Sequence, residues 1–402
     1  RKDYGWKEYY YNDFYVLQRH KAAELGKCDF YCEAVETKEL TLMLEKVFEE
    51  ILAVLARQPM KQIRTYSPGP WGAYRYRQLW DIPGLENNAW NRLAGADLSL
   101  LIELENGVKI NIPSVDLLID NAAVFVGEFP AREYPGLIPV EIWLDDGYFP
   151  DKQPAERTSM PIHNHPGTEY VKRHFNEPLG RYETYYIVEA YPGANTWMGF
   201  NNDACTEEWD TQCRKSWKEQ KAIPDWKEYI ANWQTNVGDL FLIPEGTTHG
   251  HGGYQMVLEM DTCGNAAGGE YSFFGYDFMR PTWDDRKKTM TGKPMKMHLE
   301  RYFEIDKGFR ADWVQKNLRA RPVVIEWNQE YSRDGTTEGK YLQAATLTVG
   351  TSVVIRSKAH PERCCRIERL QCALIPAGFG DYEIINEDEG ASTVVMWRLK
   401  QA

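Results

Sequence analysis

The sequence predicts a mainly β protein with helical additions, in which two β-barrels in tandem follow a helical N-terminal arm. Three observations lead to this prediction. Short β-type runs separated by Gly, Pro and Asn recur from about residue 98 onward, a pattern typical of antiparallel sandwiches and barrels. The pattern Leu-Ile-Pro-x-Gly occurs twice, beginning at Leu242 and at Leu374, which favours two related barrels. The first 60 residues have helical periodicity instead.

The N-terminal arm is predicted to contain an amphipathic helix between Thr37 and Gln58. Its apolar residues recur at spacings of three and four, which places them on one face: Leu40, Met43, Leu44, Val47, Ile51, Val54 and Leu55. Thr37 is a candidate N-cap, and Pro59 ends the pattern. A weaker segment at 9–25 predicts a companion helix. We assign residues 1–65 to this arm, a candidate homodimerisation element without chemistry of its own.

The predicted strands form two groups. The first group covers 98–104, 108–112, 122–129, 140–144, 185–190, 196–200, 240–244 and 255–260. The second group covers 343–349, 351–356, 372–375, 382–385 and 392–398. A charged, Trp-rich interval at 203–231 interrupts the first group and predicts a helical insertion. The predicted domains are therefore 66–300, which carries the insertion, and 301–402.

Charge and composition argue against several classes of partner. The chain has 47 Lys and Arg against 59 Asp and Glu, a net charge of −12, and no basic cluster reverses this balance locally. We therefore expect neither nucleic-acid binding nor membrane binding. No apolar run approaches the roughly 18–20 residues that a membrane helix needs, and the first residues do not resemble a signal peptide. Eight Cys are too dilute for a disulfide scaffold, so we expect reduced thiols and a cytoplasmic protein.

Five of the eight histidines lie between positions 163 and 251. His163 and His165 are two residues apart, so on a strand their side chains point to the same face. Two imidazoles on one face, with Cα atoms about 7 Å apart, can chelate a single divalent metal ion. This pair is the first half of a candidate metal site.

The second half lies in the segment from Gly238 to His249. It is similar to the second signature of the cupin superfamily, Gly-x5-Pro-x-Gly-x2-His, at every fixed position. Pro244 and Gly246 are expected to bend the chain at the barrel rim, so that His249 enters the interior. The carboxylate that cupins add is Glu183, at the head of a predicted strand. Three neutral nitrogens and one anionic oxygen suit Zn best, with Mn, Fe, Co and Ni as alternatives.

The order of motifs also resembles that of the compact bacterial type I mannose-6-phosphate isomerases, over roughly residues 155–285. The matching segments are His163-Asn-His165-Pro166, Glu183-Thr-Tyr-Tyr-Ile187, Pro192-Gly-Ala194, Pro244-Glu-Gly-Thr-Thr-His249, Leu258-Glu259 and Tyr276-Asp-Phe-Met-Arg280. This resemblance implies two tandem cupin domains, which are jelly-roll β-barrels, with the metal in the first. It also implies a metal-free second barrel, where Asp381 takes the place of the histidine.

Four positions depart from the family's pattern. The family's Gln ligand is His163 here, and the Ser two residues before it is Pro161. The Lys that precedes the Glu ligand by two residues is Arg181, and the family's catalytic Arg aligns with Phe274. An unphosphorylated or otherwise modified sugar therefore fits the sequence about as well as a sugar phosphate.

The chemistry implied by the resemblance is the transfer of a proton between C1 and C2 of a sugar through a cis-enediol. A bound metal stabilises the developing oxygen charge, and a positioned base moves the proton. Glu259 is the first candidate for this base, although a strand residue in its place can also point outward. Arg181 and Arg280 are candidates to hold a phosphate or to polarise O1, with surface arginines as the alternative. His251 is interpreted as a solvated turn residue, with a further metal-proximal imidazole or a second base as the alternative. His174 is interpreted as a residue near the pocket mouth.

Two other functions remain open from the sequence. Three His and one Glu also form the metal shell of cupin dioxygenases and decarboxylases, so an oxygen-dependent enzyme is one alternative. A non-catalytic sugar-binding cupin is the other, favoured by Phe274 at the position of the catalytic Arg.

Overall fold

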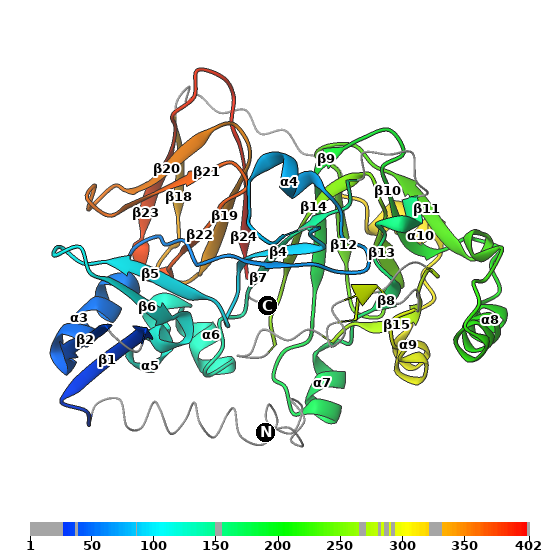
Figure 1. The fold of residues 1–402 in the computed structure, drawn as a ribbon, viewed down its shortest axis with the longest axis horizontal. Coiled ribbons are helices and arrows are strands. Elements are labelled where there is room, and N and C mark those ends of the chain that lie inside the picture. Colours follow the sequence, from blue (N-terminus) through cyan, green and yellow to red (C-terminus); the bar gives the residue numbers. More distant parts are fainter. Residues whose placement is uncertain are drawn as a thin grey trace.

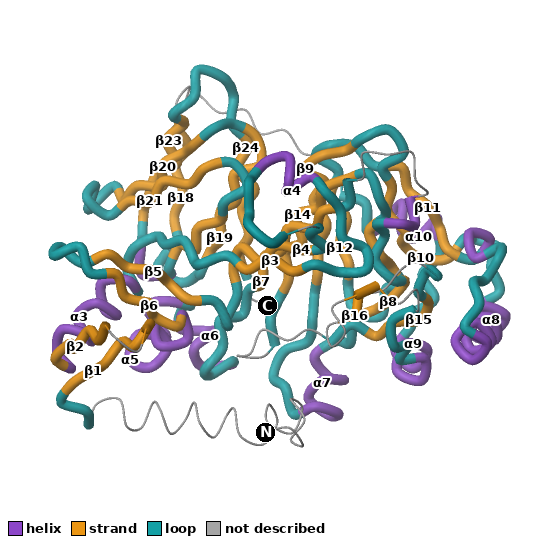
Figure 2. The backbone as a smooth tube through the Cα atoms, viewed as in Figure 1, coloured by secondary structure: helices purple, strands orange, loops and turns teal. Residues whose placement is uncertain are grey.

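The fold was analysed in a computed structural model of the 402-residue chain. It describes residues 27–36, 39–85, 87–148, 155–264, 271–279, 283–284, 289–290, 294–320 and 332–399. Two β-barrels lie side by side (Figures 1 and 2). The first contains the green and yellow strands of Figure 1, and the second contains the orange and red strands. The companion helix predicted at 9–25 lies outside the described residues.

The first barrel consists of two antiparallel sheets that face each other. One sheet has the order β11 (Ile230–Gln234), β10 (Asn195–Phe200), β13 (His249–His251), β8 (Ile162–Asn164) and β15 (Phe273–Tyr276). The other has the order β12 (Leu240–Ile243), β9 (Glu183–Ala190), β14 (Gln255–Asp261), β7 (Glu141–Asp146), β4 (Trp90–Ala94) and β3 (Thr65–Ser67). Sheet-on-sheet packing of this kind encloses a narrow interior, which is where an inward-facing functional group is held.

The second barrel repeats this plan with fewer strands. One sheet has the order β18 (Ser332–Thr336), β23 (Asp381–Asn386), β20 (Ser352–Ser357) and β21 (Cys364–Glu368). The other has the order β22 (Cys372–Ile375), β19 (Gln343–Val349) and β24 (Thr393–Arg398). The repeated Leu-Ile-Pro-x-Gly pattern occupies equivalent places, since it spans the ends of β12 and β22.

Helices and hairpins cover the outside of the barrels. The N-terminal elements are β1 (Phe30–Glu36), β2 (Glu39–Leu44), α3 (Glu45–Leu55), α4 (Arg75–Leu79), β5 (Ser99–Glu103), β6 (Lys109–Pro113), η2 (Ser114–Leu117), α5 (Leu118–Phe125) and α6 (Glu128–Glu133). The later ones are η3 (Ala155–Arg157), α7 (Thr168–Phe175), α8 (Thr206–Glu219), η4 (Trp226–Glu228), β16 (Trp283–Asp284), β17 (Thr289–Met290), α9 (Leu299–Ile305), α10 (Ala311–Asn317) and η5 (Ala377–Phe379). Among the described residues, no helix is long and apolar enough to span a membrane.

The predicted mainly β architecture is confirmed, and α8 and η4 lie within the interval 203–231. Two local predictions are wrong. The run at 122–129 forms the end of α5 and the start of α6 rather than a strand, because its apolar residues pack against neighbouring helices. The segment 39–44 is strand β2 rather than helix, because it pairs with β1 along its length. Tertiary pairing overrides helical periodicity there.

The division at residues 65 and 300 stays a prediction. Residues 309–320, beyond that second boundary, contact the first barrel through the backbone. The Phe200 amide donates to the Phe309 carbonyl at 2.8 Å, and the Leu242 amide donates to the Leu318 carbonyl at 2.8 Å. Helix α10 therefore covers the first barrel.

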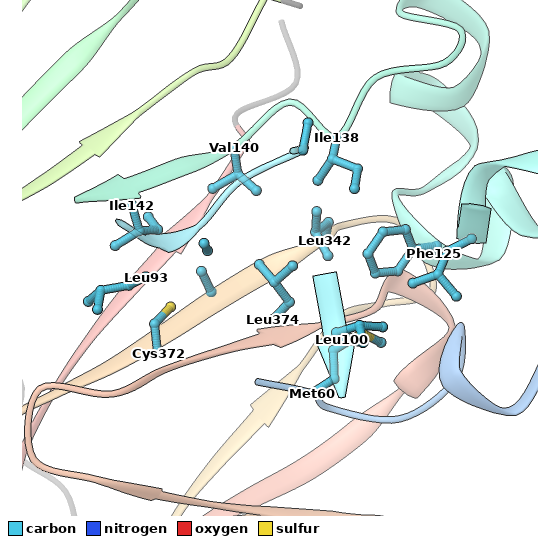
Figure 3. Close-up of a cluster of buried hydrophobic side chains, with 14 of the residues drawn as sticks. Met60, Leu93, Leu100, Phe125, Ile138, Val140, Ile142, Leu342, Cys372 and Leu374 are labelled. Carbon is cyan, nitrogen blue, oxygen red and sulfur yellow. The ribbon is translucent and has the colours of Figure 1, made fainter. Parts of the chain in front are cut away.

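A shared apolar core joins the two barrels (Figure 3). In β22, Cys372 and Leu374 face the first barrel, whereas Ala373 and Ile375 face the interior of the second. Strand alternation thus buries both faces of this sheet, which explains why β22 reads as a continuous apolar run. Met60 pairs with Leu374 through two backbone hydrogen bonds of 2.9 and 2.8 Å, which fixes the register of this contact.

A buried ion cluster around Glu189 adds a polar link between the barrels. Glu189 lies on β9 and is 8% exposed. It accepts hydrogen bonds from Arg75 Nε at 2.7 Å and from Arg369 Nη2, on the second barrel, at 2.6 Å. Burial alone would raise the pKa of the Glu189 carboxyl, but Arg75, Tyr191 and Arg369 hold this pKa below its ordinary value.

Replacing Glu189 by Gln should lower the free energy of unfolding by about 1–3 kcal/mol, because two guanidinium groups lose their charged partner. Since the folded-state pKa is depressed, the wild-type advantage is complete above the unfolded pKa and is lost as pH falls through the folded pKa. Chemical denaturation at pH 7 and pH 3 measures both effects. The control is Glu103→Gln, which removes an exposed 3.7 Å pair with Lys109 and should change stability by less than about 0.5 kcal/mol. Equal losses in the two variants would contradict the prediction.

Candidate metal centre

The structure brings four sequence-predicted residues together inside the first barrel. They are His163 on β8, His165 just after it, Glu183 at the start of β9 and His249 at the start of β13. One potential ligand atom from each lies within 4.8 Å of the others, and all four side chains are buried. Bonds of about 2.0–2.2 Å to a single ion place ligand atoms at most about 4.4 Å apart, close to this spacing.

Strand register and one glycine produce this convergence. His249 pairs directly with His163 across the β13–β8 ladder, so neighbouring strands carry the two imidazoles. Gly246 has φ of +68°, and a Cβ on it would lie 2.2 Å from the Ile305 carbonyl oxygen. Only glycine permits this turn, which delivers the chain from β12 to β13. The sequence pattern Pro-x-Gly-x2-His therefore has a direct structural cause.

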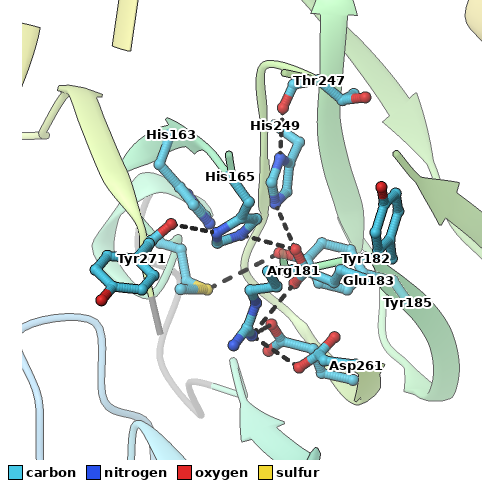
Figure 4. Close-up of polar contacts among 12 residues, drawn as sticks. His163, His165, Arg181, Tyr182, Glu183, Tyr185, Thr247, His249, Asp261 and Tyr271 are labelled. Atoms are coloured by element: carbon cyan, nitrogen blue, oxygen red, sulfur yellow. Dashed lines mark hydrogen bonds and ion pairs between the residues drawn. The ribbon is translucent and has the colours of Figure 1, made fainter. Parts of the chain in front are cut away.

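Backbone carbonyls fix the orientation of all three imidazoles. Nδ1 of His163 lies 2.7 Å from the Pro161 carbonyl, and Nδ1 of His249 lies 2.7 Å from the Thr247 carbonyl. Nδ1 of His165 lies 3.0 Å from the carbonyl of Tyr271 (Figure 4). Because a carbonyl only accepts, each Nδ1 carries the hydrogen, and each neutral ring presents the lone pair of Nε2 to the interior.

These lone pairs face a carboxylate. Nε2 of His165 and of His249 lie 2.8 and 3.0 Å from Glu183 Oε2, so electron-rich atoms face one another. Burial lowers the pKa of His165. Burial and the neighbouring imidazoles hold the pKa of His163 well below its ordinary value. Burial alone would raise the pKa of the Glu183 carboxyl, but its neighbours, including a hydrogen bond from Glu259, hold this pKa well below its ordinary value. Neutral imidazoles around an ionised carboxylate form a donor set that fits a divalent metal ion.

A second charged layer lies behind the four metal-facing residues. Arg181 is 5% exposed, and its Nη2 lies 2.7 Å from both Glu259 Oε1 and Asp261 Oδ2. Its Nη1 lies 3.3 Å from Glu141 Oε2. Arg92 also donates to Glu141, at the other carboxyl oxygen. Arg181 is therefore neither a surface arginine nor a side chain that projects into open space.

Glu259 points into the barrel, which settles the question of its orientation. It is 4% exposed, and its carboxyl lies beside that of Glu183. Burial and the adjacent charge of Glu183 raise the pKa of Glu259 well above its ordinary value. A carboxyl in such surroundings takes up a proton more readily than an exposed one, which marks it as a candidate acid–base group.

Other residues singled out in the sequence occupy different places. His251 is fully buried on β13, 3.8 Å from Asp145, so its interpretation as a solvated turn residue is wrong. His174 is exposed on α7 and stacks on Tyr170. Phe274 packs its edge against the His163 ring, with centroids 5.8 Å apart. Arg280 lies outside the described residues.

Sequence reasoning missed Glu141, Asp261 and Arg92. One signal was available, because Asp261 follows Glu259 by two residues and must share its face on a strand. Glu141 has no such signal, since its role depends on the β7–β14 register that sets it opposite Asp261. The Tyr271 carbonyl is a backbone group, which residue type does not reveal.

Curated relatives match part of the chain, two mannose-6-phosphate isomerases among them, and no family model matches it. Mannose-6-phosphate isomerase ManA of Bacillus subtilis is 27% identical over 146 residues, which are 36% of this chain and 40% of that protein. Mannose-6-phosphate isomerase of Streptococcus mutans is 23% identical over 237 residues, which are 58% of this chain and 63% of that protein. The chain thus spans less than two thirds of these relatives.

Solved structures match over a greater length. The mannose 6-phosphate isomerase from Bacillus subtilis superposes with a TM-score of 0.57 at 15% identity, covering 84% of this chain and 99% of that one. The chain has the fold of these isomerases. A zinc-bound mannose 6-phosphate isomerase gives a TM-score of 0.58 at 11% identity, covering 85% and 99%. The resemblance to mannose-6-phosphate isomerases, first inferred from the motifs, is confirmed, as is the expected cupin-like fold.

Replacing His249 by Ala should abolish stoichiometric metal binding, because one of three nitrogen donors is lost while the fold's apolar core is untouched. Mass spectrometry of the metal content should find one divalent ion per wild-type chain and a small fraction of that in the variant. Metal removal should also lower the wild-type melting temperature, since a ligand that binds only the folded state stabilises it.

The matched control is His360→Ala. This histidine is exposed in the turn between β20 and β21 and lies beside Glu362. Its loss should leave both metal content and melting temperature unchanged. Full metal occupancy in the His249 variant would contradict the assignment.

Proposed function

We propose that the protein is a metal-dependent aldose–ketose isomerase that acts on a sugar or sugar phosphate. The observation that carries this proposal is a buried set of three imidazoles and one carboxylate with a second carboxyl, Glu259, directly beside it. The likeness to mannose-6-phosphate isomerases in sequence and fold supports the same reaction class.

We propose His163, His165, Glu183 and His249 as the metal ligands. Zinc is the first choice, because the donor set suits it and because one of the structural relatives is zinc-bound. Mn, Fe, Co and Ni accept the same donors. A metal held there would supply Lewis-acid stabilisation of the oxygen charge that develops as the proton moves.

Glu259 is proposed as the base that moves the proton between C1 and C2. Because its pKa is raised, the Glu259 carboxyl takes up a proton more readily than an exposed one, as a group that must both accept and return a proton should. Backbone carbonyls fix the orientation of the three imidazoles. The groups around the base therefore need little reorganisation during the reaction.

The substrate class is proposed more broadly than mannose 6-phosphate. Phe274 brings an apolar ring beside His163, at the position where the family pattern has its catalytic Arg. Arg181 is held by three carboxylates, so the phosphate clamp proposed for it loses support. We therefore keep both free and phosphorylated sugars as substrates to be tested, and Arg280 as a proposed phosphate contact.

The oligomeric state and the cellular compartment of the protein are also proposals. A homodimer through the N-terminal element is supported by the exposed apolar side chains of Phe30, Leu42 and Leu44 on one face of the β1–β2 hairpin. Sedimentation velocity measures it directly. The reducing cytoplasm is proposed as its compartment because eight cysteines in 402 residues are too few for a disulfide scaffold.

The proposed reaction should incorporate deuterium at C2 when the protein is incubated with its sugar in D2O. Proton NMR of a panel of mannose, fructose, glucose and their 6-phosphates, with the zinc-loaded protein, checks this. Glu259→Gln should lower the exchange rate by about 10²–10⁴-fold because the base is lost, while the metal content stays at one ion. The control Glu245→Gln, at an exposed carboxyl paired with Lys307, should keep the wild-type rate.

Other outcomes separate the alternative functions. Sugar binding without exchange for any member of the panel would favour the non-catalytic sugar-binding cupin, for which Phe274 is the supporting observation. Oxygen consumption by an iron- or manganese-loaded protein would favour the dioxygenase.

A further inference from the structure

The guanidinium of Arg181 stands at the centre of a buried acidic triad. Ligand atoms of Glu183, Glu259 and Asp261 lie within 4.8 Å of one another, which is a spacing that would attract a cation. Nη2 of Arg181 reaches two of them at 2.7 Å and lies 4.0 Å from Glu183 Oε1 (Figure 4). The cation of this triad is therefore a side chain.

Sheet geometry explains why the arginine is held so firmly. Glu259 and Asp261 are two residues apart on β14, so both side chains lie on its inner face. Glu141 lies opposite Asp261 on β7. The Nη1 atom of Arg181 points to Glu141, so its two terminal nitrogens are spread over three carboxylates. Arg92 fixes Glu141 in turn. A planar fork with fixed donor directions can hold several carboxylates in one arrangement, which a flexible ammonium cannot do.

We propose that Arg181 is a positioning residue that holds the carboxyl of Glu259 against the metal centre, and that it does not bind the substrate. The inference rests on the proposed function, because Glu259 is there the base. A substrate phosphate at Arg181 would have to displace carboxylates already at 2.7 Å from a guanidinium whose residue is only 5% exposed. The arginine therefore acts on the reaction through Glu259.

The test compares Arg181→Gln and Arg181→Lys in the zinc-loaded full chain. With Glu259 free to rotate, kcat for the best sugar of the panel should fall by about 10²-fold in Arg181→Gln, because misplacing a reacting group by about 1 Å costs that much. Arg181→Lys keeps the charge without the fork and should recover about tenfold of this loss. KM should change by less than about threefold in both variants, since no substrate contact is removed.

Arg75→Lys is the matched control. Arg75 also holds a buried carboxylate, because its Nε donates to Glu189 at 2.7 Å, but Glu189 lies near the other end of β9 from Glu183. Its kcat should stay within about threefold of the wild type, as expected for a change outside the reacting groups. A loss in Arg75→Lys equal to that in Arg181→Lys would overturn the proposal in favour of general support of the core. A KM increase of tenfold or more at unchanged kcat would overturn it in favour of substrate binding.

A crystal structure of Arg181→Lys and of the wild type separates this inference from the proposed function. If the wild type catalyses no deuterium exchange, the isomerase proposal fails, yet the Glu259 carboxyl must still be displaced in Arg181→Lys and unmoved in Arg75→Lys. An unmoved Glu259 in Arg181→Lys overturns the positioning role whatever the activity. Melting curves of all variants confirm that the proteins compared are folded.

Discussion

The structure depends on one unfavourable arrangement: imidazole lone pairs face an ionised carboxylate in an interior closed to water. Each Nδ1 hydrogen goes to a backbone carbonyl, so none of the three rings can turn its other nitrogen into a donor without losing that bond. Protonating a ring at Nε2 would also relieve the contact, but burial lowers the pKa of His163 and His165 and so disfavours the protonated imidazole. A divalent ion bound by these donors would relieve it.

Charge balance in the surrounding layer leads to the same conclusion. The buried ionisable groups around the centre are the carboxyls of Glu141, Asp145, Glu183, Glu259 and Asp261 and the guanidiniums of Arg92 and Arg181. The acids outnumber these permanent cations, and a divalent ion would offset part of the negative excess. The raised pKa of Glu259 is the local response to this excess, because protonating one acid removes part of it. Metal and proton are therefore linked at Glu259, the group proposed to carry protons in the reaction.

The sequence predicted those features that depend on spacing along the chain. The His163/His165 pair follows from strand alternation, and His249 follows from a glycine turn that only one backbone conformation permits. It failed where long-range pairing decides the outcome. Strand β2 forms because β1 is beside it, and the run at 122–129 is helical because of its packing. For Arg181 the sequence predicts a substrate contact. The acids around it depend on the register between β7 and β14, which the residues near Arg181 in the sequence do not reveal.

The second barrel shows how small a change removes such a centre. The same Leu-Ile-Pro-x-Gly segment begins in β22, but its last two residues form the short helix η5 with Phe379, and Asp381 begins β23 exposed to solvent. The interior receives Phe379 and Tyr382 in place of polar donors, and these pack with Val353 and Ile355. Apolar packing there frees the other face of β22 and β19 to cover the first barrel. The duplicated fold thus supports the view that one copy holds the charged centre while the other supplies the apolar surface that keeps it rigid.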